Sequence, residues 1–259
     1  MSPAPEPDPV AGFYDQLAPH YRLVYHDWEA SVERQALALD GTISEFVGPD
    51  AETVLDAACG IGTQSLGLAE LGYRVTASDL SAEAVELARA EADRRGLEID
   101  FGVADMRSLA EAYRGRFDVV LACDNALPHL LADDDILLAL RQFHDCLVPG
   151  GGCIVSVRDY SHGEREGRVI HPRKVHDTPD GRVVMFDVWE FAGDRYDMTT
   201  YVVEDLGGSE ARARVIRGGR YYCVPIERLE ELMREAGFKH AGTFRDRFFQ
   251  PLLVGVRPS

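Results

Sequence analysis

The residues whose types and spacing could do chemistry form a glycine-rich turn between two apolar runs. Asp56 ends the first run, Gly60 and Gly62 follow it, and Asp79 ends the second run. Glycines at such a turn let the main chain approach a ligand without a Cβ atom in the way. The helix that follows presents free N–H groups, which attract an anionic group, and Asp79 can accept two hydrogen bonds from a ribose diol. The turn therefore predicts a site for a ribose-bearing ligand.

Two features of this turn argue against a dinucleotide as that ligand. The spacing places Ser65 where a dinucleotide site has its third glycine. Asp56 would repel a pyrophosphate, whereas it would attract an ammonium group. S-Adenosylmethionine carries a ribose, a sulfonium and an amino-acid end, so it suits both acids. We therefore predict S-adenosylmethionine as the cofactor, with Asp56 beside its ammonium group and Asp79 beside its ribose.

Apolar runs and helical patterns alternate along the chain around this turn. Strand-like runs occupy residues 53–58, 73–79, 98–105, 117–124 and 153–159. Helical spacing occupies residues 63–72, 81–96, about 133–147 and 226–238, and two further strands end the chain. This alternation predicts an α/β fold: a doubly wound, seven-stranded, mainly parallel sheet with helices on both faces. Ligands of such sheets bind at the carboxyl ends of the strands, where Asp56 and Asp79 lie.

Three flanking segments complete the predicted organisation of a single domain over residues 12–259. Residues 1–11 are rich in proline and acids and predict a disordered leader, and residues 12–47 predict a helical N-terminal cap. Residues 160–225 predict an antiparallel β insertion over the active edge of the sheet. Its expected strands lie at 182–191, 198–206 and 211–224.

The composition excludes several classes of partner. The formal net charge of −17 argues against nucleic acid or an anionic membrane, because phosphate binding needs clustered Lys and Arg. The five cysteines show no Cys-x-x-Cys spacing and no histidine cluster completes a metal pattern, so we expect no metal and a reducing, cytoplasmic compartment. No apolar stretch approaches the roughly 20 residues that span a bilayer. A homo-oligomer stays open, because nothing in the sequence reports assembly.

Several short motifs resemble those of the class I S-adenosylmethionine-dependent methyltransferases. They are DAACGIGT at 56–63, SDLS at 78–81, VADM at 103–106 and LACDNALPHL at 121–130. The resemblance covers roughly residues 12–159 and the last helix and strands, and it implies the Rossmann-like methyltransferase fold. It implies that Asp79 holds the ribose hydroxyls and that Asp105 and Met106 take the edge and face of the adenine. Within the same motifs it adds four cofactor contacts: Ala57, Leu80, Cys123 and Asn125.

Four segments resemble the glycine/sarcosine N-methyltransferase group within that class. They are YDQLAPHY at 14–21, CDNALPHL at 123–130, VSVRDY at 155–160 and RYYCVP at 220–225. The resemblance implies that Arg158, near Tyr160, grips the carboxylate of the methyl acceptor. It also implies that Tyr221 and Tyr222 line the acceptor pocket, although neighbours on a strand face opposite ways, so one of the two is expected to point elsewhere.

The N-terminal segment carries three more contacts that this resemblance implies. Tyr14 and Trp28 would close over the cofactor, and Arg34 would bind its carboxylate. The candidate polar groups for proton handling follow the fourth strand, and they are Asp124, Asn125 and His129. A histidine there could equally cap or pack against a helix.

The sequence thus predicts an enzyme that moves a methyl group from S-adenosylmethionine to a small-molecule acceptor. The expected acceptor is the amine of an amino acid or a related metabolite that carries a carboxylate. Two alternatives stay open: an O- or C-methyltransferase of a natural product, and a non-catalytic protein that only binds the cofactor. Arg158 could also form an ordinary ion pair with Glu190 or Asp187 of the insertion, which would remove the argument for a carboxylate.

Overall fold

A seven-stranded sheet forms the centre of the computed structural model, which describes residues 8–163, 165–179 and 181–259. Its strand order is β10-β11-β5-β4-β1-β2-β3. The strands are β1 (Thr53–Asp56), β2 (Arg74–Asp79), β3 (Ile99–Val103), β4 (Phe117–Ala122), β5 (Leu147–Ser156), β10 (Lys239–Phe244) and β11 (Leu252–Val256). Only the pairs that involve β11 are antiparallel. The prediction of a doubly wound, mainly parallel sheet is confirmed.

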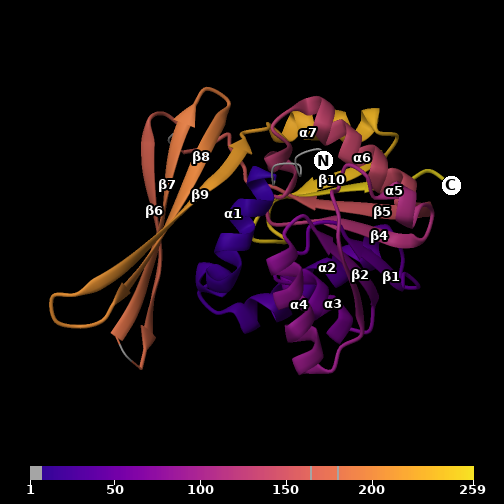
Figure 1. The fold of residues 1–259 in the computed structure, drawn as a ribbon. Coiled ribbons are helices and arrows are strands. Elements are labelled where there is room, and N and C mark those ends of the chain that lie inside the picture. Colours follow the sequence, from indigo (N-terminus) through magenta and orange to yellow (C-terminus); the bar gives the residue numbers. More distant parts are fainter. Residues whose placement is uncertain (1–7, 164, 180) are drawn as a thin grey trace, which may run out of the picture.

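Helices cover both faces of this sheet (Figure 1). One face carries α2 (Trp28–Phe46), α3 (Thr63–Glu70) and α4 (Ala82–Arg95), and the other carries α5 (Ala110–Tyr113), α6 (Asp133–Cys146) and α7 (Ile226–Glu235). β4 shows why its sequence is continuously apolar: Val119 and Leu121 enter the core on one face, while Val120 and Ala122 enter the core on the other. A central parallel strand has no solvent face, so polar residues are confined to its ends.

A second, four-stranded antiparallel sheet follows β5 in the chain. It consists of β6 (Arg168–Thr178), β7 (Gly181–Ala192), β8 (Arg195–Asp205) and β9 (Ala211–Tyr222). The antiparallel insertion is confirmed, but the prediction of three strands is wrong, because it omits β6. Pro172 and several charged residues hide β6 in the sequence, and an edge strand tolerates both because one of its sides needs no sheet partner.

The N-terminal helix begins earlier than predicted. α1 (Pro9–Leu17) starts at Pro9, and the side chain of Asp8 caps it with a 2.8 Å hydrogen bond from the main chain. Proline is favoured at the first position of a helix, where its missing N–H needs no partner. Residues 9–11 therefore belong to α1 and not to a leader, and the rest of the expected leader, residues 1–7, lies outside the described residues.

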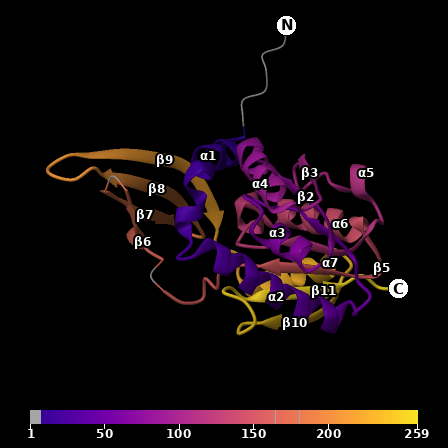
Figure 2. The same ribbon diagram turned by 90° about the horizontal axis from the view of Figure 1, so that it is seen from below.

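α1 lies between the two sheets, as both views of the ribbon show (Figures 1 and 2). Its Phe13 and Leu17 pack against Met185 and Tyr196 of the insertion. A Cβ atom at Gly219 of β9 would stand only 3.1 Å from the Phe13 ring, so the glycine permits this close approach. The short helix η1 (Ala18–Val24) then leads the chain into α2. The N-terminal segment thereby joins the insertion to the main sheet beside the strand ends.

Candidate active site

The glycine-rich turn connects β1 to α3, and its backbone needs both glycines. Gly60 and Gly62 have φ values of 52° and 88°, in the left-handed region that side chains disfavour. The main-chain N–H of Gly60 donates to Asp79 Oδ2 at 2.8 Å, and that of Ser81 donates to Asp79 Oδ1 at 2.9 Å. Burial raises the pKa of Asp79, and these two hydrogen bonds oppose the rise. Asp79 therefore fixes the turn on one side while its remaining lone pairs face the space above it.

A cavity of about 730 Å³ opens over this turn, which is within the range for a cofactor-sized ligand. Its wall combines the ends of β1, β2 and β4 with α1 and the insertion. Nine residues predicted for the site line it: Tyr14, Ala57, Gly60, Asp79, Leu80, Asp105, Met106, Cys123 and His129. A Cβ atom at Gly60 would meet no protein atom within 4 Å, so the main chain is bare on that side. These residues fit a ribose-bearing cofactor.

Asp105 lies at the wall of this cavity in an ion pair with Arg107. The guanidinium donates to both carboxylate oxygens of Asp105, at 2.6 Å to Oδ2 and 3.0 Å to Oδ1. Although burial works in the opposite direction, these bonds from Arg107 hold the pKa of Asp105 below its usual value. Asp105 is therefore ionised at neutral pH and can accept a hydrogen bond from an adenine amino group.

The structure shows how the Asp56 side chain is oriented. Its side chain is 1% exposed and does not reach the cavity wall. Oδ2 accepts a 2.7 Å hydrogen bond from the Ser65 hydroxyl, and burial raises the pKa of Asp56 to about 6. Ser65, on the first turn of α3, thus turns the carboxylate toward the helix. Asp56 braces the glycine-rich turn from behind in this structure, and its contact with the cofactor's ammonium group stays a prediction.

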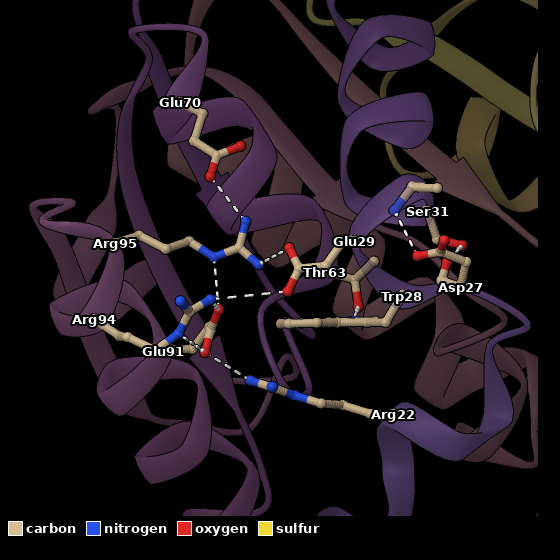
Figure 3. Close-up of polar contacts among 11 residues, drawn as sticks. Arg22, Asp27, Trp28, Glu29, Ser31, Thr63, Glu70, Glu91, Arg94 and Arg95 are labelled. Atoms are coloured by element: carbon tan, nitrogen blue, oxygen red, sulfur yellow. Dashed lines mark hydrogen bonds and ion pairs between the residues drawn. The ribbon is translucent and has the colours of Figure 1, made fainter. Parts of the chain in front are cut away.

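Trp28 also lies outside the cavity, contrary to the prediction. It is 6% exposed, and its Nε1 donates to Thr63 Oγ1 at 2.9 Å. The guanidinium carbons of Arg22 and Arg95 lie 4.1 Å and 5.3 Å from the indole centroid, and Figure 3 shows both arginines converging on this region. Because Thr63 does line the cavity, Trp28 supports the site through it. The same wall includes Tyr25, whose hydroxyl accepts from Thr63 Oγ1 at 3.2 Å.

Three other predicted cofactor contacts have different places. Gly62 serves as the N-cap of α3 and does not line the cavity. Asn125 is 1% exposed and accepts a 3.0 Å hydrogen bond from the main-chain N–H of Arg158. Arg34 donates to Ser31 Oγ at 3.0 Å and lines a second cavity instead of the first. Side-chain direction decides the cases of Asn125 and Arg34, and motif spacing does not report it.

The second cavity, of about 430 Å³, adjoins the first beneath the insertion. The two cavities share part of their lining, namely Tyr14, Tyr21, Tyr25, Asp124 and Met198. A molecule in the second cavity would therefore be adjacent to a cofactor in the first. This arrangement is the geometry that group transfer between two bound molecules requires.

Arg158 lines the second cavity and has only neutral partners there. Its Nη1 donates to the Tyr196 hydroxyl at 2.7 Å, and its guanidinium carbon lies 4.8 Å from the Trp189 ring centroid. Burial would lower the pKa of Arg158, but the surrounding tyrosine oxygens raise it above its usual value. Within the part of the chain that the structure describes, no carboxylate forms an ion pair with Arg158.

The ordinary ion pairs proposed for Arg158 are absent because their acids pair elsewhere. Glu190 binds Arg168, and Asp187 accepts from Arg173 at 2.7 Å. Asp187 also accepts a 2.7 Å hydrogen bond from the Thr200 hydroxyl. Arg158 therefore remains a cation without an acidic partner among these residues, and it borders the second cavity.

His129 and two tyrosines form a hydrogen-bonded row between α1 and β9. His129 Nδ1 lies 2.9 Å from the carbonyl oxygen of Arg220, so Nδ1 carries the proton and donates it. Nε2 then accepts from the Tyr14 hydroxyl at 2.8 Å, and Tyr14 accepts from Tyr221 at 3.2 Å. Burial lowers the pKa of His129 to about 3. The imidazole is neutral and both its nitrogens are occupied, so it orients Tyr14 and does not accept a substrate proton.

The remaining two predicted acceptor contacts do not reach either cavity. Tyr222 faces away from Tyr221 and packs against the core beneath α6 and α7, as strand alternation requires. The Tyr160 hydroxyl bonds with Asn125 Nδ2 at 2.9 Å and lies 3.3 Å from the Tyr196 hydroxyl. Tyr160 therefore positions the group that holds Arg158 and does not contact the acceptor space.

Sequence reasoning missed four residues of the second cavity or its support. They are Tyr21, Tyr25, Arg173 and Tyr196. The aromatic spacing of residues 13–28 was one available signal, because rings at such intervals in a segment before the first strand can close over a ligand. Asp124 is already a candidate from the sequence, because it comes just after a buried strand. Arg173 and Tyr196 had none, because their neighbours across the antiparallel sheet are set by register.

The comparisons with known proteins agree with this geometry. Residues 54–151 match the family model described as a methyltransferase domain. They include the glycine-rich turn, the carboxylates that face the first cavity and the end of β4. Residues 54–151 therefore form a methyltransferase domain, and the comparisons support a class I S-adenosylmethionine-dependent methyltransferase. S-Adenosylmethionine is accordingly its cofactor.

This methyltransferase has relatives that act at different atoms. It is 30% identical over 164 residues to a glycine/sarcosine N-methyltransferase of Halorhodospira halochloris, a match that covers 58% of this chain and 60% of that enzyme. It is 34% identical over 134 residues to a ubiquinone biosynthesis O-methyltransferase of Xanthomonas axonopodis pv. citri (strain 306), covering 50% of this chain and 54% of that enzyme. The matches thus span little more than half of these relatives.

A solved structure resembles this methyltransferase over nearly its whole length. It is that of CalS10 with bound S-adenosylmethionine, an amino pentose methyltransferase from Micromonospora echinaspora. The TM-score is 0.75 at 20% identity, with 92% of this chain and 95% of that chain covered. The likeness is one of fold, and it includes the part of the chain that forms the insertion.

Two kinds of feature are absent from the described residues. They contain no group of three or more His, Cys, Asp or Glu side chains placed to hold a metal ion. Among their helices, none has the length and apolar character needed to cross a membrane.

Proposed function

We propose that this methyltransferase transfers the methyl group of S-adenosylmethionine to the amine of a small metabolite that carries a carboxylate. One observation supports the carboxylate above all: Arg158 lines the second cavity without an acidic partner among the described residues. A guanidinium offers a carboxylate two parallel N–H donors and so fixes both its place and its direction. The similarity to a glycine/sarcosine N-methyltransferase supports an amine as the methylated group.

The chain's own residues supply positioning in this proposal. S-Adenosylmethionine brings a methyl group already activated by a positive sulfur, so the protein needs no nucleophile of its own. Asp79 and Asp105 would hold the adenosine part, and Tyr14 would cover it from α1. Arg158, held by Tyr196 and Trp189, would hold the acceptor beside it. Alignment of two bound reactants can supply roughly 7–11 kcal/mol of the barrier reduction.

The test is a screen followed by one substitution. Formation of S-adenosylhomocysteine is measured with amino acids, simple amines, amino sugars and phenols, and we expect turnover with amino acids. Arg158→Met should lower kcat/KM for the best amino acid about 100-fold or more, because it removes the partner of a desolvated charge. The affinity for S-adenosylhomocysteine, measured by calorimetry, should change less than about threefold.

Arg182→Met is the matched control. Arg182 lies on β7, is 59% exposed, and pairs with Asp205 away from both cavities. This variant should turn over amino acids as the unmodified protein does. Turnover confined to phenols or to sugars without a carboxylate, at a rate that Arg158→Met does not change, would contradict the proposal and favour O-methylation or sugar N-methylation.

A further inference from the structure

Asp124 lies where the two cavities meet. It follows the carboxyl end of β4 and lines both the first cavity and the second. The backbone of Asp124 and Asn125 is left-handed, with φ values of 54° and 66°. Left-handed backbone at two successive non-glycine residues is unfavourable and persists only where the surroundings hold it. Ser156 does so, because its hydroxyl accepts from the Asp124 N–H at 2.7 Å and its carbonyl accepts from the Asn125 N–H at 2.9 Å.

The Asp124 carboxylate has two long hydrogen bonds and no ion pair in the described part of the chain. The Tyr25 hydroxyl donates to Oδ2 and the Gln250 side-chain amide donates to Oδ1, both at 3.3 Å. A carboxylate removed from bulk water normally collects short, charge-assisted hydrogen bonds. Asp124 therefore retains lone pairs for a donor that the protein itself does not supply.

The electrostatic surroundings of Asp124 come from several elements. Tyr14 of α1, Tyr21 of η1 and Tyr25 face it as neutral phenols, and burial with the Asp124 charge raises the pKa of each. Burial raises the pKa of Asp124, while the charges of Arg158 and Arg173 lower it. The second cavity thus places an acid at its junction with the cofactor cavity and a cation, Arg158, elsewhere on its wall.

We propose that Asp124 binds the acceptor's ammonium group and takes its proton, so that the acceptor is a zwitterion held by Asp124 and Arg158 together. This inference rests on the proposed function, and it adds the residue that recognises the amino group and the charged form in which the acceptor binds. A simple carboxylate would leave the charge of Asp124 unpaired and a neutral phenol would leave both charges unpaired, which penalises the binding of either.

The proton transfer balances as follows. The ammonium group gives one proton to the Asp124 carboxylate, which leaves a neutral amine with a free lone pair. That lone pair forms the new bond to the methyl carbon while the carbon–sulfur bond breaks and its electrons stay on sulfur. The product is a methylated ammonium and a neutral thioether, and the proton on Asp124 passes to water when the site opens. Positioned proton acceptors of this kind contribute roughly 100- to 10,000-fold.

Asp124→Asn is the first test, because asparagine also tolerates left-handed backbone. The probes are glycine, or the best amino acid of the screen, and its analogue without the amino group, which is acetate in the case of glycine. With the protein saturated by S-adenosylhomocysteine, calorimetry should show that Asp124→Asn binds the amino acid at least about tenfold more weakly. Acetate should bind Asp124→Asn at least as tightly as the unmodified protein, because the variant removes the unpaired charge. Asp93→Asn, at an exposed aspartate of α4, is the control and should bind both probes normally.

The pH profile separates a proton acceptor from a residue that only supports structure. In the unmodified protein, kcat/KM should fall at low pH as Asp124 becomes protonated. Asp124→Asn should be at least about 100-fold slower at pH 7 and should recover toward high pH, as free amine becomes abundant in solution. Rate loss that is equal at all pH values, or weaker binding of acetate as well, would overturn the inference.

Gln250→Leu keeps the inference testable if Asp124→Asn does not fold. Gln250 is 7% exposed and gives one of the two hydrogen bonds that favour the ionised Asp124. Its removal should raise the pKa of Asp124 and move the acidic limb of kcat/KM upward by about half a pH unit or more. An unmoved limb would overturn the role of Asp124. If amino acids turn over while these variants behave normally, only this inference fails; if no amino acid turns over, the proposed function fails first.

Discussion

At the scale of single residues, His129 offers a direct test of protonation in the site. Burial lowers its pKa to about 3, and Nδ1 donates to the Arg220 carbonyl. We therefore expect the ring to stay neutral, with the proton on Nδ1, from pH 5 to pH 8. Nitrogen-correlated NMR of the imidazole reports both the charge and the tautomer, and His129→Gln assigns the signal. A titration midpoint within that pH interval would contradict the prediction and return His129 to the candidates for proton transfer.

Single residues also show what sequence can and cannot predict. Asp79 and Asp105 line the first cavity as expected, because their position at strand ends follows from the strand pattern alone. Asp56 was also placed at a strand end, but its direction depends on Ser65, whose hydroxyl draws the carboxylate toward α3. The charge argument indicates a suitable cofactor, while the contact of Asp56 with its ammonium group stays a prediction. A strand end fixes where a residue lies, whereas local hydrogen bonds fix where its side chain points.

At the scale of elements, an ion-pair cluster around Glu91 connects the N-terminal segment to α4 (Figure 3). Glu91 is 4% exposed and pairs with Arg22 of η1 and with Arg94 and Arg95 of its own helix. Arg95 also binds Glu29 of α2. Hydrogen bonds from Arg94, Arg95 and Arg22 lower the pKa of Glu91 to about 2, although burial by itself would raise it. Since Arg22 also stacks on Trp28, the cluster sets the position of the segment that carries Tyr25.

Glu91→Gln should therefore destabilise the protein in a pH-dependent way. A carboxyl group whose folded pKa lies below its unfolded value stabilises the fold above the unfolded pKa, about 4.5, and loses that effect as the pH falls toward 2. We expect a loss on the order of 2 kcal/mol at pH 7, which shrinks between pH 5 and pH 3. Urea denaturation at several pH values measures it.

Glu86→Gln is the control for this pH series. Glu86 is 68% exposed and pairs with Arg89 on the outer side of the same helix, so its loss should change stability by less than about 0.5 kcal/mol. A Glu91→Gln deficit that is constant with pH would show that the side chain acts through packing and not through its charge.

At this scale, a helix or strand is predictable from the sequence when its hydrophobic pattern is strong. Except for the four-residue α5, the helices and buried strands of the main sheet are predicted from the sequence, because hydrophobic spacing specifies them. β6 was missed because Pro172 and its charges imitate a loop, and the start of α1 was missed because Pro9 and Asp8 imitate a disordered leader. Each of these residues is favourable where it lies: proline at an edge or in a first helical turn, and aspartate at an N-cap. The same residue types are typical both of loops and of edge strands or helix starts, and only the neighbouring elements decide between these structures.

At the scale of the whole molecule, the first cavity has walls from three separate parts of the chain. The glycine-rich turn and the strand ends form its floor, α1 forms one side, and β8 and β9 of the insertion form another. A cofactor in this cavity would contact all of them at once. Binding energy that is shared in this way must stabilise the contact between α1 and the main sheet, because a ligand favours the arrangement that it binds.

Hydrogen exchange can measure this coupling directly. On saturation with S-adenosylhomocysteine, we expect the amides of α1 and of the glycine-rich turn, residues 58–63, to exchange at least about tenfold more slowly. Amides of α7, which packs against the far face of the sheet and lines neither cavity, should not change. Tyr14→Ala should abolish the added protection of α1 while leaving that of the turn, since Tyr14 is an α1 side chain that lines the cavity and bonds to His129. Protection of the turn without any effect on α1 in the unmodified protein would mean that α1 is not part of the cofactor site.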